Sequence, residues 1–158
     1  MITYTNQRLR GRNKPKPMNF EQYASEGNRI INEVTCQLGT DRDHAARVTR
    51  AVLHAIRDRI PPDDAIQFAQ GLPMALKGVF IDRYDPSKTP VTIRHKEKFI
   101  DFVRSKNPSA AADFPDRESV IYALQAVFYV LENNMSYGQV QQIKNMLNIE
   151  IVTLIDAV

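Results

Sequence analysis

Three histidines and one cysteine are the side chains of this sequence best suited to metal binding or nucleophilic catalysis: His44, His54, His95 and Cys36. Di-metal sites in helical bundles usually combine inward-facing carboxylates with two Glu-x-x-His pairs. The nearest counterpart is Asp41-x-x-His44, and no second pair accompanies it. Asp41 precedes a predicted helix, where a helix cap is the simpler role. We therefore predict no metal site and no bound cofactor.

The remaining candidates also have simple structural interpretations. His54 and Asp58 are four residues apart on one predicted helix, which favours a surface ion pair. His95 lies in a basic stretch and is expected to face water. Cys36 has no C-x-x-C partner, and a half-buried helical position is expected for it rather than a nucleophilic role beside a histidine. We assign no catalytic residue.

Local signatures of the common enzyme classes are missing from the sequence. It contains no phosphate-binding G-x-x-x-x-G-K-[ST] loop, no G-x-G-x-x-G, no H-E-x-x-H and no G-x-S-x-G. The basic N-terminus has no apolar region of a secretory signal, and no apolar run reaches the roughly 18–20 residues that span a bilayer. A single cysteine fits a reducing compartment. We expect a cytoplasmic protein without a membrane partner.

Positive charge is concentrated in two segments of the 158-residue chain. The net charge is +3 and the isoelectric point is about 9.1. Residues 1–18 form a basic arm without acidic residues, and the rest of the chain is slightly acidic. The basic residues of the arm are Arg8, Arg10, Arg12, Lys14 and Lys16, and those of the second segment are Arg94, Lys96, Lys98, Arg104 and Lys106. These side chains could contact phosphates, although a solvated tail and helix face is the favoured interpretation because no nucleic-acid recognition motif accompanies them.

Apolar residues recur at helical spacing from Phe20 onward, and no segment alternates with a period of two. The fold class is therefore predicted to be all-α. Thr92 is a candidate cap for the fifth helix, and residues 109–115 are predicted to form a loop. The expected helices span 20–38, 41–60, 62–70, 74–81, 93–106, 116–134, 136–147 and 148–158. The domain prediction is an arm over 1–18 and one helical domain over 19–158.

An internal repeat appears when the sequence is shifted by 75 residues. Residues 41–81 then lie on 116–156 without a gap, with few identities but matching apolar positions. The predicted units are 19–82 and 93–158, joined by a linker over 83–92. A unit of about 60 residues is marginally stable by itself, so the two should bury their apolar stripes against each other. This predicts a compact bundle of about eight helices built from two similar four-helix units.

The string RAVLHAIRDRIPPDDAIQFAQGLP, followed by MALKGVF, resembles the bacterial and archaeal domain of unknown function 2267 family. Members of that family look like tandem copies of a helical unit. The second unit keeps Ala126 and Val127 of the motif but lacks its prolines. The resemblance covers roughly residues 19–156 and implies a helical fold but no activity. The matching residues of the first unit are Arg50, Ala51, Val52, Leu53, Arg59, Pro61, Ala65 and Pro73.

The helix expected from residue 116 differs from its counterpart in the first unit by being apolar on all sides. It has Tyr122 and Tyr129 where the first unit has Arg47 and His54. A helix of this kind must be covered all round. One interpretation is a central helix packed under the arm or the first helix; the other is that Tyr122 and Tyr129 face a second copy or another protein, since aromatic residues are enriched at interfaces.

Three functions follow from these patterns. The first is a non-catalytic interaction module that self-associates or binds another protein. The second is weak binding of nucleic acid or another polyanion through the arm and residues 94–106. The third is an enzyme whose site lies between the two units and cannot be recognised from sequence.

Overall fold

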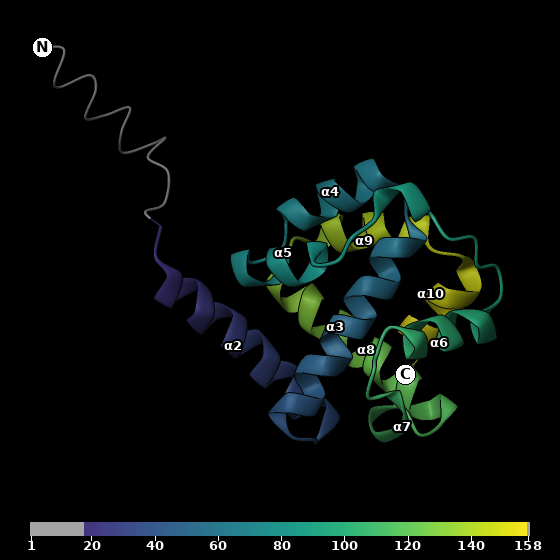
Figure 1. Ribbon diagram of the computed structural model, residues 1–158, viewed down its shortest axis with the longest axis horizontal. Coiled ribbons are helices and arrows are strands. Elements are labelled where there is room, and N and C mark those ends of the chain that lie inside the picture. The colour runs from purple at the N-terminus through teal and green to yellow at the C-terminus, as the bar shows by residue number, and fades with distance from the viewer. Residues whose placement is uncertain (1–17, 158) are drawn as a thin grey trace, which may run out of the picture.

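Helices form nearly all of the regular structure in the computed structural model, which describes residues 18–157 (Figure 1). The arm residues Arg8 to Lys16 lie outside this range. Within it there are nine α-helices and no strand, which confirms the predicted all-α bundle. The helices are α2 (Phe20–Leu38), α3 (Arg42–Arg59), α4 (Pro62–Gln70), α5 (Met74–Ile81), α6 (Lys96–Ser105), α7 (Ala110–Asp113), α8 (Arg117–Asn134), α9 (Tyr137–Met146) and α10 (Ile149–Asp156), with a 3-10 turn η1 (Pro86–Lys88) between α5 and α6.

Most helices begin at a residue whose side chain caps them. The Asp41 carboxylate accepts a hydrogen bond from the His44 backbone N–H at 2.8 Å, which confirms its predicted role. Asp116 and Ser136 each form a capping box with the residue three positions later. Gly39 ends α2 in the left-handed conformation, with a φ of 63°. These local signals explain why the predicted helix ends agree well with the observed ones.

Two local predictions are wrong, and a contact with a distant residue explains the first of them. Thr92 does not cap α6; the helix begins at Lys96, whose backbone N–H donates to the Glu150 carboxylate of α10 at 3.0 Å. The segment predicted as a loop contains the short helix α7, rich in alanine, a strong helix former. Burial of Phe114 directly after α7 holds this turn against the body.

The two 18-residue helices α3 and α8 contact each other in the middle of the bundle. Helices α2 and α6 each pack against both of them, so the core joins both halves of the chain. Its largest fully buried side chains include Phe80, Phe99, Phe114 and Phe128. No helix in residues 18–157 is both long and apolar enough to cross a membrane.

Helix starts in the second half of the chain follow those of the first half at a constant spacing. Helices α8, α9 and α10 begin 75 residues after α3, α4 and α5, respectively. Gln67 and Gln142, which occupy equivalent positions, contact each other across α4 and α9 at 3.4 Å. The wider interpretation, two similar four-helix units, stays a prediction.

Helix α2 extends beyond the rest of the bundle at its N-terminal end (Figure 1). Only Gly27, Ile30 and Val34 of this helix are buried. Met18 and Phe20, at its start, are 80% and 75% exposed. The first turns of α2 therefore present apolar side chains outside the bundle.

Candidate functional site

A groove of about 850 Å³ runs along α8, and we name it the α8 groove. The end of α2 and the start of α3 line it at one side, and the end of α10 lines it at another. Tyr122 and Tyr129, the two residues that the sequence singled out, both line it. Its other lining residues include Leu38, Val48, Ser119, Gln125, Glu132, Ile155 and Asp156.

Tyr122 and Tyr129 lie two turns apart, on the side of α8 that faces the groove. Their exposed fractions are 65% and 52%, whereas most apolar residues of the same helix are buried. Neither hydroxyl bonds to any residue within 18–157. The described part of the chain therefore covers α8 on its core side and leaves this aromatic stripe open.

A buried carboxylate, Asp113, fixes one end of the groove. Arg47 binds both of its oxygens, Nε to Oδ2 at 2.7 Å and Nη2 to Oδ1 at 2.8 Å. Asn107 donates to Oδ2 at 2.9 Å, and the Nδ1 atom of His44 lies 3.5 Å from Oδ1. The hydrogen bond from Arg47 is the main reason that the pKa of Asp113 lies below its ordinary value, against the effect of burial. This arrangement anchors α7 to α3.

A three-residue ion cluster lies at the other end of the groove. Lys144 Nζ donates to Glu132 Oε1 at 2.7 Å and to Asp156 Oδ1 at 2.8 Å. Burial opposes the charge on Lys144, but these two hydrogen bonds outweigh it and raise the pKa of the ammonium group. Glu132 and Asp156 remain about half exposed, so two carboxylates share one cation and the cluster keeps a negative charge. Both carboxylates line the groove.

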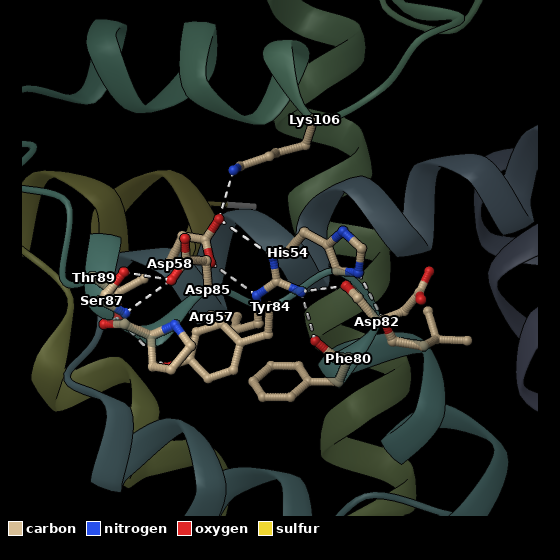
Figure 2. A network of polar contacts seen from close by, with 12 residues as sticks. His54, Arg57, Asp58, Phe80, Asp82, Tyr84, Asp85, Ser87, Thr89 and Lys106 are labelled. Carbon is tan, nitrogen blue, oxygen red and sulfur yellow. Dashed lines mark hydrogen bonds and ion pairs between the residues drawn. The ribbon is translucent and has the colours of Figure 1, made fainter.

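A second polar network lies on α3, away from the α8 groove (Figure 2). The Arg57 guanidinium donates to the carbonyl oxygens of Phe80 and Asp82 at 2.9 and 2.8 Å and to Asp58 Oδ1 at 2.8 Å. It also stands 5.0 Å from the centre of the Tyr84 ring. Lys106 Nζ donates to the other oxygen of Asp58 at 2.5 Å. The network ties the end of α3 to the segment that follows α5.

The predicted surface ion pair between His54 and Asp58 is wrong. His54 is only 6% exposed, and its Nε2 atom lies 2.7 Å from the carbonyl oxygen of Val79. Burial is the main reason that its pKa lies below the ordinary value. Asp58 instead binds Arg57 and Lys106, because α5 covers His54 and the end of α6 brings Lys106 to Asp58. Sequence spacing within α3 could not show these two neighbouring helices.

Two further candidates for metal or nucleophilic chemistry lie at the surface. His95 is exposed, as predicted, with its Nδ1 atom 4.0 Å from Glu150 Oε1. Cys36 is exposed rather than half-buried. Among residues 18–157, no group of three or more His, Cys, Asp or Glu side chains is placed to hold a metal ion.

The second basic segment is divided in two by the structure. Arg94, Lys96 and Lys98 are exposed at and before the start of α6. Lys106 is drawn inward by Asp58 and lies 4.6 Å from the centre of the Phe102 ring, while Arg104 is half-buried. Three of the five basic side chains predicted to contact phosphates in this segment are therefore exposed near one another in the sequence.

The acidic character of the α8 groove was not recognised from the sequence, although Glu132 and Asp156 were visible in it. The signal is the position of Glu132, which lies three residues after Tyr129 on the same side of the helix. Asp156 joins it only because α10 packs beside α8.

Comparisons with known proteins place the chain in one family. No curated protein matches it. The family described as "Uncharacterized conserved protein (DUF2267)" matches residues 27–154, which include every helix of the bundle at least in part. The chain therefore belongs to the DUF2267 family of uncharacterized conserved proteins.

Proposed function

We propose that this protein is a non-catalytic interaction module that self-associates through the α8 groove. The observation that carries the proposal is the open stripe of Tyr122 and Tyr129 in a groove that crosses several helices. Exposed aromatic residues that line a concave surface are typical of protein interfaces. Closure of the groove by a second copy would complete the cover that an apolar helix requires.

The buried polar side chains support a structural rather than a catalytic use of the interior. Thr49, Asn107 and Lys144 each hydrogen-bond to a neighbouring backbone or side-chain oxygen. The remaining buried polar residues bind one another or backbone carbonyls in the same way: His54, Arg57, Asp58 and Asp113. The single cysteine supports a reducing, cytoplasmic setting as part of the proposal.

The test is a double variant, Tyr122→Arg with Tyr129→Glu, compared with the native protein by light scattering after gel filtration. We expect the native protein to have twice the mass of one 18.1-kDa chain and the variant to have the mass of one chain. Both positions are more than half exposed, so the variant should stay folded. The control is Tyr137→Arg, on α9 outside the groove and 79% exposed. An unchanged mass in the folded double variant would contradict the proposal.

A second candidate is weak binding of nucleic acid or another polyanion, and the exposure of Arg94, Lys96 and Lys98 favours it. Phosphate contacts of this kind weaken steeply as salt rises. Binding of a labelled DNA duplex and of a labelled RNA would be measured at low and high salt. Reversal of the three charges to glutamate should weaken binding, and deletion of residues 1–18 should weaken it as well; no binding by the native protein at low salt would exclude this candidate.

A further inference from the structure

We propose that the α8 groove binds the basic N-terminal segment, residues 1–17, of a second copy of this chain. The inference rests on the proposed self-association and names the segment that fills the groove. It follows from a comparison of the α8 groove with the equivalent face of α3, together with the charges on the two surfaces and on the segment.

Residues of α3 and α8 that are 75 positions apart present opposite chemistry. The α3 face carries cationic or ionisable nitrogen side chains, whereas the α8 face carries aromatic, amide and carboxylate side chains. The α3 residues are Arg47, Arg50, His54 and Arg57. The α8 residues at the same positions are Tyr122, Gln125, Tyr129 and Glu132.

An irregular segment of the chain, which includes the 3-10 turn η1, already covers part of the α3 face. After α5, Asp82 accepts a hydrogen bond from Arg57 through its carbonyl oxygen, and the Tyr84 ring lies against the Arg57 guanidinium (Figure 2). Farther along, the Val91 backbone N–H donates to the carbonyl oxygen of Asp58 at 2.7 Å. This segment brings an aromatic ring and acidic residues to a helix face rich in cations. The chemistry of the segment is thus matched to that face.

The α8 face is aromatic and acidic, so a matching segment would have to be basic. Within residues 18–157, no segment after α10 crosses it in this way, and the Gln125 side chain binds the carbonyl oxygens of Leu154 and Ala157 at the groove's edge. Two tyrosine rings offer faces on which guanidinium or ammonium groups bind favourably. Among residues 18–157, Lys144 is the one cation paired with Glu132 and Asp156, so the cluster keeps a negative charge. A segment rich in arginine and lysine fits these groups.

Residues 1–17 have the composition that this groove selects. They contain five basic residues, at every second position from Arg8 to Lys16, and no acidic residue. Side chains at alternate positions of an extended segment point to the same side, so these cations can face one surface together. Seventeen extended residues span up to about 55 Å. An 18-residue helix such as α8 is about 27 Å long, so the segment can cover the groove and bridge two protomers.

Reach alone allows the segment to bind its own groove or that of a second copy, and the exposed apolar start of α2 favours the second copy. The far end of α8 lies beside the middle of α2, where Asn134 donates to Glu33 at 2.9 Å. Phe20 lies 13 residues before Glu33, so α2 carries the chain about 20 Å past this point before the segment begins. Met18 and Phe20 are exposed there, and reciprocal exchange of segments would cover them against the partner.

The test uses mixed full-length protomers. One sample carries a nitroxide on Cys36, which is exposed next to the groove-lining Gln37 and Leu38. The other is ¹⁵N-labelled and carries Cys36→Ser, so it cannot take the spin label. We expect the nitroxide to broaden amide signals of residues 1–17 in the ¹⁵N-labelled chain at least twofold more than those of α9. Broadening that appears only when label and isotope are in one chain would overturn the proposal, because the segment would then bind its own groove.

A second measurement separates this proposal from self-association itself. The full-length variant Arg8→Glu, Arg10→Glu, Arg12→Glu should have half the mass of the native protein in solution. The matched control, Arg94→Glu, Lys96→Glu, Lys98→Glu, changes the same number of charges outside the groove and should keep the native mass. If the tyrosine variant is monomeric but the arm variant is not, self-association stands and this inference fails. If the native protein is monomeric, both fail.

Discussion

Asp58 shows how a single buried carboxylate holds several parts of the molecule together. Its side chain is 11% exposed and binds Arg57 at 2.8 Å and Lys106 at 2.5 Å. Burial disfavours its charge, but the hydrogen bonds from Arg57 and Lys106 outweigh that effect and keep its pKa below the ordinary value. Arg57 in turn binds the carbonyl oxygens of Phe80, within α5, and of Asp82, directly after it, so this carboxylate connects α3 and α6 with the end of α5.

Removal of this charge should be costly. We expect Asp58→Asn to lower the free energy of unfolding by about 3 kcal/mol, because Arg57 would keep a buried charge without a counter-ion. Urea unfolding measures the change. Asp101→Asn is the control, since Asp101 is exposed and its change should stay within about 0.5 kcal/mol. Equal effects of the two substitutions would show that the buried ion cluster contributes nothing.

His54 should make stability depend on pH. Burial, with Arg57 and Arg50 nearby, holds its pKa below the ordinary value of 6.5 for a histidine. As the pH falls, the unfolded state therefore takes up the proton first. The contribution of neutral His54 to the free energy of unfolding is thus fully present above pH 6.5 and is lost as the pH falls through the folded-state pKa. We expect His54→Gln to lose less stability than the native protein between about pH 7.5 and pH 5. A His54→Gln profile parallel to the native one would contradict the assignment.

At the scale of elements, close approach of α2 to α5 depends on one glycine. A Cβ atom at Gly27 would lie 2.8 Å from the Cβ of Ala75, whereas one at Gly78 would meet nothing within 4 Å. We expect Gly27→Ala to destabilise the fold because the two helices must separate. Gly78→Ala should stabilise it by up to about 1 kcal/mol through helix propensity. Thermal unfolding of both variants checks the pair, and a Gly27→Ala protein as stable as the native one would show that the two helices can separate freely.

Helix ends show where local sequence is sufficient and where it is not. Asp41, Asp116 and Ser136 cap their own helices within three residues, so their roles could be predicted. The start of α6 depends on Glu150, which lies 54 residues later and reaches it only through the packing of α10 against α6. No local pattern contains that information.

At the scale of the whole molecule, the two halves of the chain form a shared core. Helix α2 packs against α8 and α6 packs against α3, so each half covers the central helix of the other. Fully buried residues at equivalent positions, such as Val52 and Val127, belong to this one core. The halves are therefore expected to unfold together.

Matched substitutions test this expectation. Val52→Ala and Val127→Ala should each lower the free energy of unfolding by about 2 kcal/mol through the cavity that each creates. Each variant should unfold in one common transition at lower denaturant concentration than the native protein. The unfolding curves followed by far-ultraviolet and near-ultraviolet circular dichroism should coincide. Two separate transitions, with each variant shifting only one, would show that the halves are independent.

The net charge is divided unevenly between the N-terminal residues and the rest of the chain. The excess of positive charge lies in residues 1–18, and the rest of the chain is slightly acidic. Of the described acidic residues that line the α8 groove, Asp113 is paired with Arg47, whereas Glu132 and Asp156 share Lys144 beside the aromatic stripe. A segment and a groove of opposite charge within the same chain are what the proposed exchange between copies requires.

The sequence by itself determined the helical class, most helix boundaries, the 75-residue spacing and the prominence of Tyr122 and Tyr129. These features depend on periodicity and capping, which act within a few residues. The tertiary structure decided which faces are covered: it buried His54, gave Asp58 its partners Arg57 and Lys106, and left the stripe on α8 open. The physical reason is that burial and ion pairing depend on residues brought together from distant positions, whereas helix formation depends on near neighbours.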